Sequence, residues 1–161
     1  MPLSPSPSPT AVPPLIQPER EYLAHLAQGR LMLLRSRQTG AVFFYPRVAE
    51  PMTGSRDLEW VPACGLGVVH ASTVVRPKPP QAAYNVALIE LAEGPRLMSR
   101  VEGLAPEAVH IGLAVRARII QPDGHDSSQP GGQPLLVFDP AANAGEYSGA
   151  ADTAAAAGGP A

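Results

Sequence analysis

Apolar side chains near the start of the chain recur at helical spacing. Four of them form pairs that lie three or four residues apart: Tyr22, Leu23, Leu26 and Ala27. This spacing places them on one face of an α-helix. Pro18 occupies a position favoured for a first helical residue, and Gly29 stands where a helix commonly ends. The pattern therefore predicts a short amphipathic helix of about three turns.

After this helix the pattern becomes strand-like. Three short segments come first: 30–35, 41–45 and 58–62. Five longer segments follow: 67–75, 84–93, 96–102, 114–121 and 135–139. Five strands of this length fit a small barrel of the OB type. The fold class expected is therefore mainly β, a five-stranded OB-fold barrel preceded by a helix and a small ribbon. A single helical turn is expected over Pro106–Val109, and the polar segment Pro122–Pro134 reads as a surface loop.

The two ends differ in composition from the rest of the chain. Seven of the 20 prolines fall in the first 18 residues, and the last 21 residues hold ten alanines and four glycines. Such segments bury too little apolar surface to offset the entropy of ordering. We expect a Pro/Ser-rich disordered arm over residues 1–17 and an Ala/Gly-rich disordered tail over 141–161. Between them, the helix and ribbon occupy 18–62 and the OB-fold 63–140.

Charge and cysteine content exclude several classes of protein. The chain has 12 Lys and Arg against 14 Asp and Glu, which argues against a nucleic-acid groove. A single cysteine, Cys64, excludes an intramolecular disulfide framework and a metal site built from several thiolates. No apolar run approaches the ~20 residues of a membrane span, and the N-terminus lacks the pattern of a signal peptide. A cytoplasmic protein with no membrane association is expected.

Several motifs, in this order, resemble one known family. They are Gln28–Leu31, Gly54–Trp60, Gly65–Val69, Ala87–Leu97, Pro106–Gly112 and Val137–Pro140. The order is similar to that of the bacterial and archaeal acyl-CoA-associated proteins called domain of unknown function 35, which join a rubredoxin-like zinc ribbon to an OB-fold. The resemblance covers roughly residues 19–140. It implies a non-catalytic accessory subunit of a thiolase-like or lipid-transfer-type enzyme, in a hetero-oligomer, with catalytic residues and acyl-CoA supplied through the partner.

The sequence departs from that family at the zinc ribbon. The resemblance places four cysteine ligands at positions that here hold Ser36, Thr39, Glu50 and Thr53. Structural zinc relies on thiolate or imidazole ligands, so we predict that the chain binds no structural zinc and no other tight cofactor. Without metal, the ribbon depends on apolar packing against the helix or a partner. We expect it to order fully only in a complex.

Candidate site residues lie close in sequence to the second pair of expected ligand positions, Glu50 and Thr53. Arg47 and Arg56 flank this pair, near Tyr45 and Trp60. Arginine suits the phosphates and adenine of coenzyme A, and Arg, Tyr and Trp are also enriched at interface hot spots. These four residues are therefore predicted to contact coenzyme A esters or a protein partner.

No catalytic residues are predicted. Cys64 has no histidine nearby in sequence before His70, and it reads as a structural thiol. The paired carboxylates Glu90 with Glu93 and Asp57 with Glu59 read as solvated strand faces.

The function expected is an accessory role in acyl-CoA metabolism, such as degradation of sterol side chains, aromatic or other unusual acyl chains. One alternative is an OB-fold protein that binds single-stranded nucleic acid, although such sites combine a basic groove with more aromatic residues than this chain has. Another is an acyl-CoA thioesterase, for which no set of nucleophile, base and oxyanion donors is found.

Overall fold

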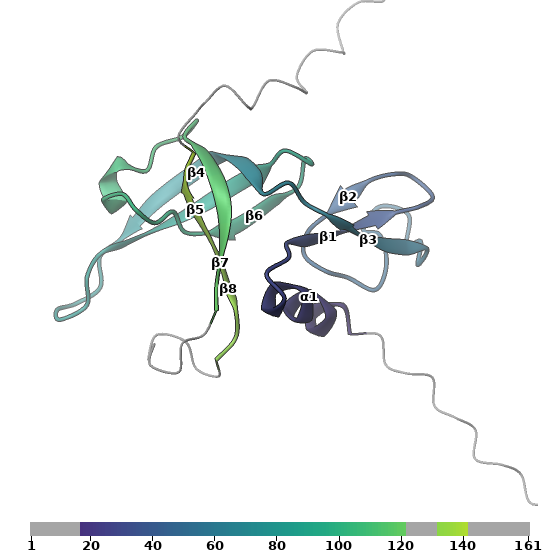
Figure 1. Cartoon of the computed structure of the whole chain (residues 1–161). Helices are drawn as coiled ribbons and strands as arrows, with labels where there is room; N and C mark the ends of the chain where they lie inside the picture. The colour runs from purple at the N-terminus through teal and green to yellow at the C-terminus, as the bar shows by residue number, and fades with distance from the viewer. Residues whose placement is uncertain (1–16, 122–131, 142–161) are drawn as a thin grey trace, which may run out of the picture.

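The computed structural model describes residues 17–121 and 132–141 and contains one α-helix, one 3-10 turn and two antiparallel sheets (Figure 1). The elements are α1 (Pro18–Ala27), β1 (Met32–Ser36), β2 (Val42–Phe43), β3 (Leu58–Pro62), β4 (Leu66–Val75), β5 (Tyr84–Leu91), β6 (Arg96–Ser99), η1 (Pro106–Ala108), β7 (Ala114–Ile120) and β8 (Leu135–Pro140). The predicted helix, helical turn and eight strands are all confirmed. The predictions for residues 1–16, 122–131 and 142–161 lie outside the described residues.

Strands β2, β1 and β3 form the small sheet, called here the ribbon together with its connecting loops. Leu34 lies between Phe43 on β2 and Trp60 on β3. The strand β2 is shorter than predicted because Phe44 leaves the ladder and packs edge-on against Tyr22 of α1, with ring centroids 5.5 Å apart. Apolar contact with the helix thus takes the place of further strand pairing.

The larger sheet has the order β6-β5-β4-β7-β8, the neighbour relations of an OB-fold. Beyond β6, Val101 forms a parallel bridge with Phe138 of β8, which brings the two edge strands together. A bulge between Val69 and Ala71 bends β4, as a sheet that curls toward closure requires. The predicted OB-fold is confirmed, with its barrel joined at this bridge rather than along a full strand pair.

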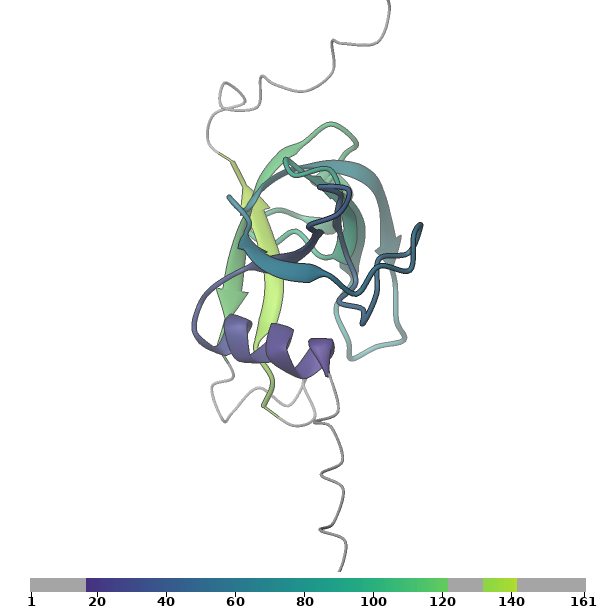
Figure 2. The ribbon, with the colours of Figure 1, turned by 90° about the vertical axis from the view of Figure 1, so that its right-hand side faces the viewer.

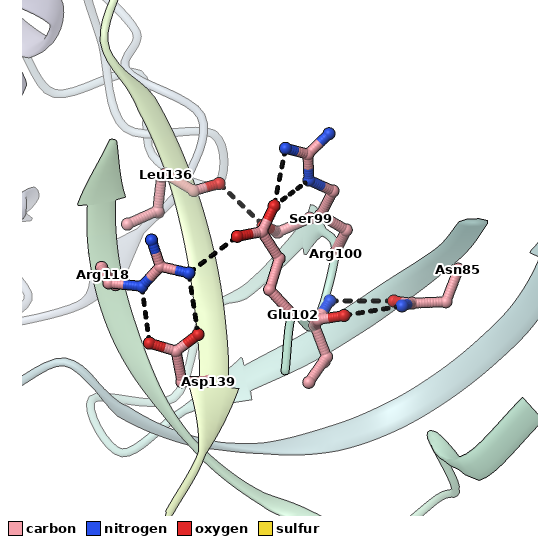
Figure 3. A network of polar contacts seen from close by, with 8 residues as sticks. Asn85, Ser99, Arg100, Glu102, Arg118, Leu136 and Asp139 are labelled. Carbon is pink, nitrogen blue, oxygen red and sulfur yellow. Dashed lines mark hydrogen bonds and ion pairs between the residues drawn. The ribbon is translucent and has the colours of Figure 1, made fainter. Parts of the chain in front are cut away.

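Two polar side chains support this junction: Ser99 joins β6 to β8, and Asn85 of β5 holds Val101, the residue that bridges to β8 (Figure 3). The Asn85 side-chain amide donates to the Val101 carbonyl at 2.7 Å and accepts from the Val101 N–H at 2.8 Å. The Ser99 hydroxyl donates to the Leu136 carbonyl at 2.8 Å. Asn85 is 4% exposed, so its amide replaces a backbone partner inside the barrel.

The outer side of the same junction carries a charged network (Figure 3). Arg118 donates two hydrogen bonds to the Asp139 carboxylate, at 2.6 and 3.0 Å, and one to Glu102 at 2.7 Å. Arg100 donates to the other oxygen of Glu102 at 2.9 Å. The Arg118 contact holds the pKa of Asp139 below its usual range.

One apolar core joins the helix, the ribbon and the barrel. Tyr22, Leu26 and Leu33 belong to the same buried cluster as Ile89 and Phe138 of the barrel. Figure 2 shows α1 lying across the ends of β7 and β8, where the Gln121 side chain donates to the Leu26 carbonyl at 3.0 Å. The helix therefore covers one end of the barrel while it supports the ribbon. The boundary predicted between residues 62 and 63 stays a prediction.

Close approach of β4 and β5 explains one glycine in the core. A Cβ at Gly67 would lie 2.8 Å from the Glu90 carbonyl oxygen and 2.8 Å from the Ile89 Cγ2. Only glycine fits there without moving the backbone. Among the described residues no helix is long and apolar enough to cross a membrane.

Candidate functional site

Two equivalent turns, called here the knuckles, lie in the ribbon at residues 36–40 and 50–54. In the first, the Gly40 N–H donates to the Ser36 carbonyl at 2.8 Å, and in the second the Gly54 N–H donates to the Glu50 carbonyl at 2.9 Å. Both glycines have left-handed φ angles, 75° and 72°, which a side chain would disfavour. The knuckle backbones are therefore formed although all four expected cysteines are missing.

The side chains at the four vacated positions converge. The Thr39 hydroxyl donates to one oxygen of the Glu50 carboxylate at 2.7 Å, and the Thr53 hydroxyl donates to the other at 2.6 Å. Ser36 is fully buried and Glu50 is 4% exposed. Hydrogen bonds from Thr53, Thr39 and Ser36 hold the pKa of Glu50 below its usual range, against the opposing effect of burial. We call these four residues the knuckle cluster.

The chain from Phe44 to Asp57, called here the ribbon loop, exposes three large apolar side chains. Tyr45 is 57% exposed, Val48 46% and Met52 89%. Tyr45 stacks on Phe44, with ring centroids 4.3 Å apart. Val48, together with Pro46 and Arg47, also lines a groove of about 470 Å³ against residues 17–20 at the start of α1. The loop thus presents apolar side chains beside an open groove.

Arg47 and Arg56 are the predicted arginines of the ribbon loop, and both are exposed. In the described part of the chain, neither guanidinium has a hydrogen-bond or ion-pair partner, whereas Arg35, Arg96 and Arg118 are each paired with carboxylates. Unpaired guanidinium groups remain available to a carboxylate or phosphate of another molecule.

Trp60 has a different environment from the two arginines. Its indole N–H donates to a Glu21 carboxylate oxygen at 2.8 Å, and its ring meets the His25 ring at a centroid distance of 5.2 Å. Both partners belong to α1, so Trp60 holds the helix to β3. The predicted contact of Tyr45, Arg47, Arg56 and Trp60 with coenzyme A or a partner stays a prediction.

Cys64 lies between the ribbon and the barrel, beside a carboxylate. The Cys64 N–H donates to a Glu93 oxygen at 2.6 Å, and the Sγ atom accepts from the Leu66 N–H at 3.4 Å. Burial and the Glu93 carboxylate raise the pKa of the thiol. A nucleophilic cysteine needs the opposite shift, so this environment suits a structural thiol.

The remaining carboxylate pairs serve as ion-pair partners. Glu90 accepts from Arg96 at 2.6 Å, and Glu59 accepts from Arg35 at 2.8 Å. Within residues 17–121 and 132–141, no three His, Cys, Asp or Glu side chains gather as a metal site would require. The carboxylates of the two predicted solvated pairs are exposed or half-buried, as expected. In each pair one member, Glu90 or Glu59, also accepts a hydrogen bond from an arginine.

Sequence comparison finds a family profile described as the C-terminal OB-fold domain of ChsH2, which matches residues 60–119. A "DUF35 domain-containing scaffold protein" of Methanocaldococcus jannaschii is 35% identical over 103 residues, which cover 60% of this chain and 73% of that protein. A "Probable enoyl-CoA hydratase alpha subunit" of Thermomonospora curvata is 38% identical over 92 residues, or 55% of this chain. This chain spans only 28% of the length of that protein.

Structural comparison finds the same kind of relative. The solved structure described as "Ltp2-ChsH2(DUF35) aldolase" contains a chain that matches with a TM-score of 0.65 and 29% identity. The match covers 80% of the present chain and 98% of the other. The structural similarity therefore extends beyond residues 60–119, the segment that the family profile matches.

Proposed function

This chain belongs to the DUF35 family, and from that premise we propose that it is a non-catalytic accessory subunit of a thiolase-like enzyme in cytoplasmic acyl-CoA metabolism. The substrates would be acyl-CoA esters such as those from sterol side chains, aromatic acids or other unusual acyl chains. The chain would bind the catalytic subunit in a hetero-oligomer and shape or stabilise its acyl-CoA site.

The observation that carries this proposal is the exposed surface of the ribbon loop, where apolar side chains are exposed and two arginines have no hydrogen-bond or ion-pair partner within the described part of the chain. Tyr45, Val48 and Met52 expose apolar area on the same loop as the unpaired guanidinium groups of Arg47 and Arg56. Aromatic residues, Met and Arg are the residue types enriched in protein interfaces, while unpaired charges at the rim favour a complementary partner. The partner face would supply apolar area for the loop and carboxylates, or bound acyl-CoA phosphates, for the arginines.

The names of the relatives support a role in an assembly. Two DUF35 relatives, from Methanocaldococcus jannaschii and Pyrococcus furiosus, are called scaffold proteins. The structural relative is named together with Ltp2 as an aldolase. A scaffold that works beside a separate catalytic chain agrees with the raised pKa of Cys64, which disfavours thiolate chemistry.

The nucleic-acid alternative gains no support from the arginines of the barrel. Arg96, Arg100 and Arg118 are each hydrogen-bonded to a carboxylate, so they contribute little net positive charge to a groove.

The experiment is co-purification of the full chain with a thiolase-like protein encoded beside it. We expect a stable complex from the wild-type chain. Met52→Asp and Arg47→Glu should each weaken the complex at least about thirtyfold, the effect of losing a hot spot worth about 2 kcal/mol.

Met98→Asp is the matched control for Met52→Asp. Met98 is also well exposed, but it lies on β6 of the barrel and away from the ribbon loop in sequence. This variant should bind like the wild type. Equal weakening by Met98→Asp and Met52→Asp would contradict the ribbon loop as the interface, and no complex with any such enzyme would contradict the function.

A further inference from the structure

The knuckle cluster takes its side chains from two equivalent turns, as a zinc ribbon takes its ligands, but here the side chains are hydrogen-bonded to one another. The Ala41 N–H donates to the Thr39 hydroxyl oxygen at 3.2 Å, and the Ser55 N–H donates to the Thr53 hydroxyl oxygen at 3.2 Å. Each hydroxyl therefore accepts from the backbone N–H of the residue that follows its knuckle, and donates its single proton to Glu50. Two matching chains of hydrogen bonds run from the two knuckles to one carboxylate.

The geometry of the cluster does not fit a zinc ion. The side chains offer one carboxylate and three hydroxyls, while structural zinc relies on thiolate and imidazole donors. The Thr39 and Thr53 oxygens lie 2.7 and 2.6 Å from the Glu50 oxygens. Two oxygens bound to one tetrahedral zinc would be about 3.4 Å apart, from a Zn–O length of about 2.1 Å. The observed distances are those of hydrogen bonds between oxygen atoms.

Burial makes the cluster important for the ribbon. A buried carboxylate without partners is strongly unfavourable, and here both oxygens receive hydroxyl protons. Ser36 ends β1, Thr39 lies in the following turn, and Glu50 and Thr53 belong to the loop before β3. The Glu50 carboxylate thus joins the turn after β1 to the loop before β3, through a hydrogen bond from Thr39, 11 residues earlier in the sequence.

We propose that the Glu50 carboxylate, held by Thr39, Thr53 and Ser36, takes the structural place of a metal ion, so that this ribbon folds without zinc and depends on the Glu50 charge. This inference does not rest on the proposed enzyme partner, because the hydrogen bonds to Glu50 lie within the ribbon. It replaces the expectation that the ribbon orders fully only in a complex. The hydrogen bonds that lower the pKa of Glu50 agree with an ionised carboxylate.

Metal content and chelation test the first half of the proposal. The full chain, expressed with added zinc and purified without chelator, should contain far less than one zinc per chain by elemental mass spectrometry. Its thermal unfolding should be unchanged by EDTA. About one zinc per chain, or an unfolding temperature that falls with EDTA, would overturn the proposal.

Substitution of Glu50 tests the second half. Glu50→Gln keeps the size of the side chain and removes its charge, and it should lower the unfolding temperature by roughly 5 °C or more. Amide hydrogen exchange should accelerate at Ala41 and Ser55, whose N–H groups donate to the two threonine hydroxyls. Glu59→Gln makes the same chemical change on the half-exposed face of the ribbon and should leave exchange at Ala41 and Ser55 unchanged.

A pair of variants at Thr53 separates the hydroxyl from the packing. Thr53→Val keeps the shape but removes the proton that reaches Glu50, whereas Thr53→Ser keeps the hydroxyl. We expect rapid exchange at Ser55 in Thr53→Val and near wild-type exchange in Thr53→Ser. Equal exchange in both variants would overturn the role of the Thr53 hydroxyl, and a Glu50→Gln chain as protected as wild type would overturn the role of the carboxylate.

Discussion

The replacement Asn85→Ala tests the junction that closes the barrel. Asn85 is 4% exposed, and its amide satisfies both the N–H and the carbonyl of Val101. Alanine leaves these two buried backbone groups without partners. Each unsatisfied group costs about 1–3 kcal/mol, so the free energy of unfolding should fall by about 2–6 kcal/mol. That is a large part of the ~5–15 kcal/mol that stabilises a typical domain.

Urea titration of the full chain measures this loss. The midpoint should fall while the slope of the unfolding free energy against urea stays unchanged, because both proteins expose the same surface on unfolding. Ser99→Ala is the control, since it removes one half-buried hydrogen bond to Leu136 and should cost only about 0.5–1.5 kcal/mol. A cost for Asn85→Ala no larger than that for Ser99→Ala would refute the assigned role of the amide.

Three further predictions concern the barrel and the knuckles. Gly67→Ala should lower the unfolding free energy by about 1–3 kcal/mol, measured by thermal unfolding, because its Cβ would press on backbone of β5. The stability gap between wild type and Asp139→Asn, followed by urea unfolding across pH, should be present at pH 7. It should close as the pH falls below about 4 through the lowered pKa of Asp139, because protonation then removes the charge of the wild-type carboxylate, and the Asn side chain carries none at any pH. The variant S36C/T39C/E50C/T53C should bind about one zinc per chain by elemental analysis, and EDTA should then destabilise it, because the knuckle backbones are already formed.

Alternation of apolar residues was sufficient to predict the sheet. The inward positions of β5 are Asn85, Ala87, Ile89 and Leu91, and all four are buried. The same alternation contained a signal for the Asn85 contact, because a polar residue at an inward position needs a buried partner. What the pattern could not provide was the partner itself. Val101 lies opposite Asn85 where the β5–β6 register continues past β6, but a buried backbone N–H and carbonyl leave no mark in the pattern of side chains.

Trp60 shows a limit of reasoning from neighbours in the sequence. Its proximity to Arg56 along the chain favoured a shared functional surface, but strand geometry directs its indole N–H to Glu21, 39 residues earlier. Arg47 and Arg56 could be nominated by residue type alone. That both lack an ion-pair partner in the described part of the chain required coordinates, because arginines such as Arg35 and Arg118 look the same in sequence.

The bonding among the side chains at the four expected ligand positions could not be predicted from the sequence. Ser36, Thr39, Glu50 and Thr53 indicated only the loss of a metal site. A signal was present in their identities, because three hydroxyl donors and one acceptor form a complementary set. Only the knuckle geometry brings the threonine oxygens within 2.7 Å of the carboxylate.

Turnover by a reconstituted pair tests the central claim most directly. A thiolase-like protein encoded beside this chain would be assayed for acyl-CoA cleavage alone, with the wild-type chain, and with the Met52→Asp chain. The account predicts that the wild-type chain increases turnover by its partner, that Met52→Asp loses most of the increase, and that the isolated chain does not cleave an acyl-CoA ester. Turnover by the isolated chain, or an enzyme whose rate and mass are unaffected by the chain, would contradict the account.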